Sequence, residues 1–160
     1  MQSWLSLGMS ALLCASVTNS TWTNSFSDGK LPGYFQSKTV IIPKDKNMAT
    51  GGQDAAESSE TMLVIADGVG GYDDLGIDSG NFARSLAVSA MTVSKERPDM
   101  NAGDVLDMAC KAAKTLQDGG STAVVIRLHD GEQGVMLESA ILGDSGFIVY
   151  RMDENGKLAK

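Results

Sequence analysis

The sequence has few of the residues on which several common kinds of functional site depend. Its 160 residues include one histidine, two cysteines and three prolines. The single histidine, His129, argues against a Ser-His-Asp triad. Cys14 and Cys110 lie far apart and form neither a CxxC motif nor a disulfide framework. A reduced, intracellular protein is the simplest interpretation.

Positive charge is also scarce. Lysine and arginine total 13 against 20 acidic residues, so the net charge is −7. A generic nucleic-acid binder would carry the opposite sign, which argues against that class. Hydrophobic residues make up 42% of the chain, which is enough for one domain with its own core and argues against disorder.

The N-terminal apolar stretch, residues 4–17, is shorter than the roughly 20 residues of a membrane-spanning helix. No lysine or arginine precedes it, which argues against a secretory signal. We expect a strand, a short helix or a frayed leader there, followed by a polar loop over residues 18–33. Residues 1–33 are therefore interpreted as a leader or a loosely packed segment, and residues 34–160 as a domain.

Apolar periodicity predicts the elements of this domain. Strands are expected at 38–43 and 61–66, with a loop at 44–60 between them. A helix should start at Asp78 or Ser79 and run to about Lys95, and its core face should carry Phe82, Leu86, Ala90 and Val93. A second helix should start near Asn101 and end at Gly119-Gly120, with a core stripe of Val105, Ala109, Ala112 and Leu116.

After the helices the apolar period falls to about two, which is typical of strands. Strands are expected at 121–128, 134–142 and 147–152, and a fourth should begin at 157–160. Turns are expected at Asp130-Gly131 and at 143–146. Two strands, two helices and an antiparallel meander favour an α+β layered domain over a doubly wound parallel sheet. The chain ends within a predicted hairpin, so we expect the domain to be incomplete at its C-terminus.

Asp67 is the best candidate for chemistry, because it ends a predicted buried strand and opens a glycine-rich turn. Carboxylate and carbonyl oxygens in such a turn suit Mg²⁺ or Mn²⁺. The alternative is a structural turn or helix cap. Asp54 and Asp144 also lie at predicted strand edges. Asp73 and Asp74 are expected to be solvated loop charges, with a place beside the ligands as the alternative.

Four ordered blocks resemble the metal-dependent type 2C serine/threonine protein phosphatases, especially the eukaryotic branch with mitochondrial and plastid members. The first is residues 51–55 (GGQDA), which resembles a GGEDA segment. The second combines 66–71 (ADGVGG) with 76–84 (GIDSGNFAR). The others are 120–123 (GSTA) and 142–147 (LGDSGF). The resemblance covers about residues 38–152.

The resemblance implies a β-sandwich flanked by helices, with a site for two or more Mg²⁺ or Mn²⁺ ions between the sheets. Asp67 would bridge two metals, and the Gly68 carbonyl would be a further ligand. Asp54 would hold metal-bound water, and Asp144 would serve an additional, weaker metal position. A metal-bridging water would attack the phosphorus of phosphoserine or phosphothreonine in a phosphoprotein substrate.

The sequence departs from the family in three places. Gln53 replaces a glutamate that is a direct metal ligand in the family, so one metal should bind more weakly here. The family's C-terminal half, with two further ligand aspartates, is not in these residues. Lys44 and Lys46 lie where the phosphate-contacting basic residue is expected, but their spacing does not match cleanly.

These departures leave an alternative open. The chain could be a catalytically inactive pseudophosphatase that acts as a binding or structural subunit. A partner chain or the missing C-terminal half could complete the domain. An intracellular location, cytoplasmic or in mitochondria or another organelle, is expected from the cysteines and from the resemblance.

Overall fold

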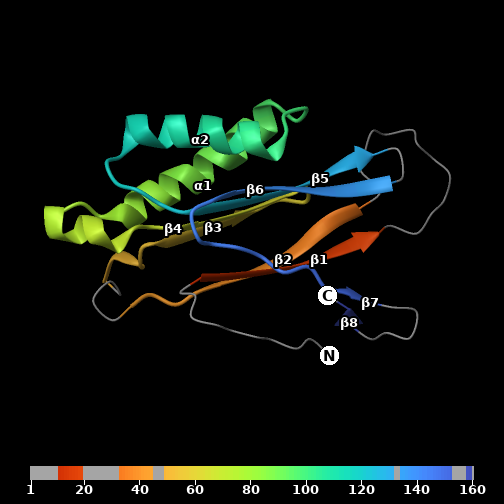
Figure 1. The fold of residues 1–160 in the computed structure, drawn as a ribbon, viewed down its shortest axis with the longest axis horizontal. Coiled ribbons are helices and arrows are strands. Elements are labelled where there is room, and N and C mark those ends of the chain that lie inside the picture. Colours follow the sequence, from red (N-terminus) through yellow and green to blue (C-terminus); the bar gives the residue numbers. More distant parts are fainter. Residues whose placement is uncertain (1–10, 20–32, 45–48, 132–133, 153–157, 160) are drawn as a thin grey trace.

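The computed structural model describes residues 11–19, 33–44, 49–131, 134–152 and 158–159. Two helices, a four-stranded sheet and a two-stranded sheet lie in three successive layers (Figure 1). The elements in chain order are β1 (Ala11–Asn19), β2 (Gly33–Ile41), β3 (Asp54–Ser58), β4 (Met62–Asp67), the 3₁₀ helix η2 (Gly70–Leu75), α1 (Ser79–Glu96), α2 (Ala102–Leu116), β5 (Ala123–Gly131), β6 (Gly134–Leu142), β7 (Arg151–Met152) and β8 (Leu158–Ala159).

The larger sheet has the strand order β3-β4-β5-β6, and all its neighbours are antiparallel. Helices α1 and α2 cover one face of this sheet (Figure 1). The antiparallel pair β1-β2 lies on the other side and contacts β3 and β4. The α+β class and the layered arrangement predicted from the sequence are confirmed. Among the described residues, no helix combines the length and apolarity needed to cross a membrane.

The main core lies between the helices and the sheet. Successive side chains of a strand point to opposite faces, so Met62, Val64 and Ala66 of β4 face the helices. The four α1 residues predicted for the core, Phe82, Leu86, Ala90 and Val93, are all buried there. A smaller cluster on the opposite face joins Phe35 of β2 to Leu63 and Leu128.

The prediction of a loop over residues 44–60 is wrong for residues 54–58. Residues 54–58 form strand β3, which pairs with β4 along its length. The segment DAAES has no apolar alternation, so local pattern gives no strand signal. The neighbouring strand supplies the hydrogen-bonding partner, and tertiary pairing decides the conformation. Strand β2 also begins earlier than predicted, at Gly33, and residues 18–19 belong to β1 rather than to a loop.

The prediction of a strand over residues 147–152 is largely wrong. Only Arg151 and Met152 are in a strand, and they pair with β8 instead of β6. Residues 147–150 (FIVY) lie in no strand, and all four are exposed. Their apolar pattern is that of a strand, but no neighbouring strand pairs with them in the described part of the chain. The predicted strand at 157–160 corresponds to the two-residue β8.

Smaller differences occur at the ends of α2 and β5. Helix α2 ends at Leu116, ahead of Gly119-Gly120, and the predicted core residue Leu116 is 63% exposed. Ala113 is buried in the core instead, and Ala112, which was also predicted for the core, is only partly buried. The predicted turn residues Asp130 and Gly131 belong to β5. Gly131 pairs with Gly134, and the two residues between them lie outside the described residues.

Candidate functional site

Asp54 and Asp67 meet at one end of the four-stranded sheet. Asp54 begins β3, Asp67 ends β4, and the two residues are directly opposed in the antiparallel register. Their neighbours Ala55 and Ala66 face the helices. Because side chains alternate along a strand, both carboxyl groups point to the face away from the helices. This face lies toward β1 and β2 (Figure 1).

The two carboxyl groups influence each other strongly. Asp54 is buried, with 5% of its surface exposed, whereas Asp67 remains open on one side. Partial burial raises the pKa of Asp67 from 3.8 to about 6, and a side-chain hydrogen bond and the charge of Asp54 add to this rise. Two carboxylates placed side by side favour sharing a proton or binding a cation. The sheet thus holds a concentrated pair of acidic oxygens at a fixed position.

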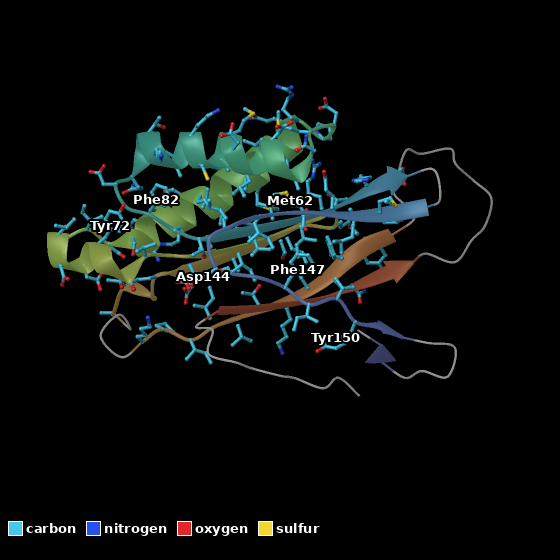
Figure 2. All side chains as sticks on the ribbon, viewed as in Figure 1. Met62, Tyr72, Phe82, Asp144, Phe147 and Tyr150 are labelled. Atoms are coloured by element: carbon cyan, nitrogen blue, oxygen red, sulfur yellow. The ribbon has the colours of Figure 1, made fainter. Side chains whose placement is uncertain are left out.

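Two other predicted site residues act on Asp67 through their charges. The Lys44 ammonium group lowers the pKa of Asp67, and the Asp144 carboxylate raises it. Asp144 is exposed in the turn that follows β6, and Figure 2 shows it on the side of the sheet away from the helices. Lys46 lies outside the described residues. The structure therefore brings Asp54, Asp67, Asp144 and Lys44 into one electrostatic neighbourhood.

Gly68 makes the tightest backbone contacts at the site. Its N–H donates to the Gln53 carbonyl at 3.0 Å, and the Val69 N–H donates to the Gly120 carbonyl at 2.9 Å. A Cβ atom at position 68 would lie 2.5 Å from the Gln53 carbonyl oxygen and 2.8 Å from that of Ser79. Neither backbone atom can move easily, so only glycine fits. These hydrogen bonds do not use the Gly68 carbonyl oxygen, which is the atom expected to act as a ligand.

Gln53 lies between the acidic pair and the 3₁₀ helix η2. Its side chain is buried, and its Nε2 donates to Oδ1 of Asp73 at 2.7 Å. The prediction that Asp73 and Asp74 are both solvated loop charges is therefore wrong for Asp73, which is half-buried, whereas Asp74 is exposed. The adjacent Gly52 carbonyl accepts a hydrogen bond from Nη1 of Arg84 at 3.0 Å. Helix α1 is thereby fixed to the segment that precedes β3.

Two hydroxyl groups join the loops beside Asp144. The Oγ1 atom of Thr122 and the Oγ atom of Ser145 are 2.6 Å apart and form a hydrogen bond. The Thr122 N–H also donates to the Asp67 carbonyl at 2.9 Å. Sequence reasoning placed both hydroxyl residues in motifs but gave them no role. No local pattern could have found the pair, because 23 residues separate its members.

The arrangement of donors fits a hard divalent cation. Asp54 and Asp67 offer carboxylate oxygens, and Gly68 offers a backbone carbonyl that the hydrogen bonds described above leave unused. Mg²⁺ and Mn²⁺ prefer such oxygen ligands and keep several waters in their shell. In the part of the chain that the structure describes, no three His, Cys, Asp or Glu side chains converge closely enough to hold a metal ion. Backbone oxygen, the Gln53 amide and water would have to complete the shell.

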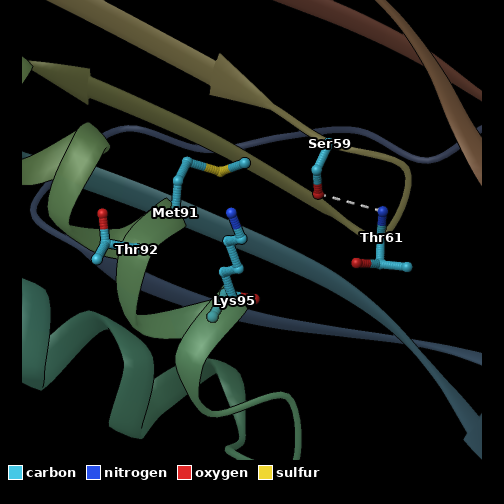
Figure 3. Close-up of a pocket in the computed structure, with 6 residues that line it drawn as sticks. Ser59, Thr61, Met91, Thr92 and Lys95 are labelled. Atoms are coloured by element: carbon cyan, nitrogen blue, oxygen red, sulfur yellow. Dashed lines mark hydrogen bonds between the residues drawn. The ribbon is translucent and has the colours of Figure 1, made fainter.

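A separate depression lies at the opposite end of β3 and β4. It has a volume of about 370 Å³ and contains none of the predicted site residues. Its lining comes from the β3–β4 turn and from the C-terminal half of α1 (Figure 3), and consists of Ser59, Thr61, Met91, Thr92, Ser94 and Lys95. This depression is therefore separate from the metal site that the sequence predicts around Asp67.

The known proteins described below, to which this sequence is similar, are all named as protein phosphatases. No protein-family model and no solved structure match the sequence. The probable protein phosphatase 2C 55 of Arabidopsis thaliana is 38% identical over 119 residues, which cover 72% of this chain and 24% of that protein. The protein phosphatase PTC7 homolog fig of Drosophila ananassae is 32% identical over 133 residues, which cover 77% of this chain and 38% of that protein.

A third relative agrees with these two. The protein phosphatase PTC7 homolog fig of Drosophila grimshawi is 40% identical over 103 residues, which cover 61% of this chain and 32% of that protein. The chain thus spans between 24% and 38% of the length of these three relatives.

Proposed function

Because the chain belongs to the type 2C protein phosphatase family, we propose that it forms part of the active site of a metal-dependent phosphatase. The substrate would be a phosphoprotein, and the bond broken would be the phosphate ester of a serine or threonine. The observation that carries this proposal is the opposed pair Asp54 and Asp67, next to a glycine whose position excludes any side chain.

We propose that Asp67 and the Gly68 carbonyl are direct ligands of Mg²⁺ or Mn²⁺. When bound, such an ion lowers the pKa of coordinated water and neutralises phosphate charge. The chain contributes a rigid support, since Asp67 and Asp54 are held by the β3–β4 ladder and Gly68 by its hydrogen bond to the Gln53 carbonyl. Burial first, and then the neighbouring Asp54, raises the pKa of Asp67, and a bound cation would favour the ionised form instead.

The remaining residues have supporting roles in the proposal. Asp54 is buried and would orient water at the metal shell. Asp144 lies close enough to act on Asp67 by charge and would serve a further, weaker cation position. The Lys44 ammonium group lies close enough to act on Asp67 by charge, so it would attract the substrate phosphate.

The test combines binding with catalysis. Calorimetry with Mn²⁺ and Mn²⁺-dependent hydrolysis of p-nitrophenyl phosphate are compared for the wild type, Asp67→Asn and Asp74→Asn. Asp74 is an exposed acid on η2 and controls for the loss of one negative charge. The proposal expects Asp67→Asn to abolish both Mn²⁺ binding and hydrolysis, and Asp74→Asn to retain both. A wild-type protein that binds no Mn²⁺ would overturn it.

The wild type could bind Mn²⁺ and still fail to hydrolyse p-nitrophenyl phosphate. That result would support the metal site and assign this chain a binding role, as expected of a pseudophosphatase or of a segment that needs the rest of the domain. Adding the remaining part of a full-length relative in trans would then restore hydrolysis only in the second case.

A further inference from the structure

We propose that Asp73 is a positioning residue that fixes the orientation of the Gln53 amide and turns its oxygen into a neutral metal ligand. This inference rests on the metal site proposed above. It concerns two residues of this chain that the expected ligand set does not explain. These are a glutamine where the resemblance implies an acid, and an aspartate on η2 that contacts it.

The hydrogen bond between them fixes which end of the amide faces which neighbour. A carboxylate has only acceptor atoms, so the Gln53 NH₂ group must point toward Asp73. The observed distance from Nε2 to Oδ1 is 2.7 Å, which is short for such a bond and typical of an ionised acceptor. With the nitrogen held there, the Oε1 atom faces the other way. It lies 3.3 Å from the position that a Cβ on Gly70 would take, beside the turn that contains Gly68.

The backbone of Gln53 reinforces this arrangement. Its carbonyl accepts the Gly68 N–H at 3.0 Å, so the residue is tied to the turn that would provide the Gly68 ligand. The side chain is buried, with 8% of the residue surface exposed. A buried amide with one end held by a carboxylate keeps few rotamers. The Gln53 oxygen is therefore held in one orientation and does not exchange places with the amide nitrogen.

Gln53 and Asp73 together carry the same net charge as the glutamate that the resemblance implies at position 53. A glutamate at position 53 would bring one negative charge, and here Gln53 and Asp73 together bring one. If glutamate stood at position 53, its carboxylate would face the Asp73 carboxylate at hydrogen-bonding distance, and two acceptors repel each other. The two positions are thus matched, and changing one without the other should be unfavourable in the protein without metal.

The test is a double-mutant cycle with Gln53→Glu, Asp73→Asn and the double variant, measured in two ways. The melting temperature in a chelator measures how the contact between Gln53 and Asp73 affects stability without metal. Mn²⁺ calorimetry measures how the same contact affects metal affinity. Gln53→Glu should lower the melting temperature by about 3–6 °C, and adding Asp73→Asn should recover most of that loss. Asp74→Asn, one residue along η2, is the matched control and should change neither measurement.

Metal affinity gives the second readout. Asp73→Asn should weaken Mn²⁺ binding by about 3- to 10-fold, because an asparagine amide can face either end of the Gln53 amide and the site also loses a charge. The double variant, with glutamate at position 53 and no opposing acid, should bind Mn²⁺ at least about ten times more tightly than Asp73→Asn.

Two results would overturn the inference. One is a melting temperature that Gln53→Glu leaves unchanged, since the facing acids would then not interact. The other is Mn²⁺ binding by Asp73→Asn that equals that of Asp74→Asn. A wild type that binds no Mn²⁺ would overturn the ligand role of Gln53 together with the proposed function. The chelator cycle would still decide whether Asp73 anchors the amide, so the two failures are distinguishable.

Discussion

Asp54 and Asp67 stand directly opposite each other on β3 and β4, although twelve residues separate them in the sequence. Asp54 is buried, and its hydrogen bond and charge contribute to the raised pKa of Asp67. Like charges at directly opposed strand positions are normally destabilising. Keeping this pair at one end of the central sheet therefore costs stability, which is consistent with the cation site proposed above.

The stability of the metal-free protein should therefore fall as the pH rises. The folded-state pKa of Asp67 is about 6, against 3.8 for an ordinary aspartate, so the folded state holds this proton more tightly. The contribution of Asp67 to stability is complete below about pH 4 and is lost as the pH rises through about 6. Asp67→Asn should therefore raise the melting temperature in chelator by about 2–4 °C at neutral pH and not at pH 4.

Melting curves from pH 4 to 8 measure this effect, with Asp74→Asn as the control. A difference between the wild type and Asp67→Asn that stays constant over this range would show that the pKa of Asp67 is not raised in the folded protein.

Gly68→Ala should be strongly destabilising. The added methyl group would meet the Gln53 and Ser79 carbonyl oxygens at 2.5 and 2.8 Å, and both belong to backbone that is held in place. Overpacking of this kind costs about 1–3 kcal/mol of unfolding free energy or more. Urea denaturation measures the loss. Gly71→Ala is the matched control, because a Cβ there meets nothing within 4 Å. Equal losses in the two variants would contradict the predicted clash.

Arg84→Ala should cost more stability than the removal of a surface ion pair. The Arg84 guanidinium group donates to the Gly52 carbonyl at 3.0 Å and to Asn81 at 2.9 Å, and pairs with Asp78 at 3.4 Å. We expect a loss of about 1–3 kcal/mol, because a backbone acceptor and a helix N-terminus lose their partner.

The comparison variant is Lys111→Ala, which removes an exposed pair with Asp107 on α2. Exposed pairs of this kind contribute little to stability, because solvent screens the charges and both side chains lose freedom. Chemical denaturation of both variants gives the ranking, and a loss in Lys111→Ala as large as that in Arg84→Ala would contradict it.

Thr122→Val should loosen the turn that carries Asp144. The substitution keeps the shape of the side chain and removes the hydroxyl that bonds to Ser145 at 2.6 Å. We expect a loss of about 1 kcal/mol and faster amide hydrogen exchange in residues 143–146. Thr115→Val is the control, since its hydroxyl bonds to a carbonyl of its own helix. Unchanged exchange in the turn would show that this bond does not hold it.

The helices and the central strand could be predicted from the sequence because their signals are local. Asp78 caps α1 as expected, and Asn101 caps α2. The apolar spacing of α1 correctly identified its buried face. The same logic failed for residues 147–150, whose apolar run is exposed and lies in no strand. A strand needs a partner, and an apolar pattern cannot supply one.

The candidate site divides in the same way. Motifs pointed to Asp54, Asp67, Gly68 and Asp144, and the structure places them at or near one end of the sheet. The contact between Gln53 and Asp73 could not be predicted, because it joins residues 20 positions apart through an amide whose rotamer depends on packing. Strand β3, which positions Asp54, was also missed, since its conformation depends on pairing with β4.

The α+β class, the two amphipathic helices and the negative charge could be read from the sequence alone, because composition and periodicities of two and 3.6 residues belong to each segment itself. The phosphatase motifs were recognised by their resemblance to a family, in the order in which they occur along the chain. That Asp54 and Asp67 share one face of a sheet, and that the Gln53 amide donates to Asp73, became visible only in the folded structure. Both depend on strand register and long-range packing, in which each residue's surroundings come from distant parts of the chain.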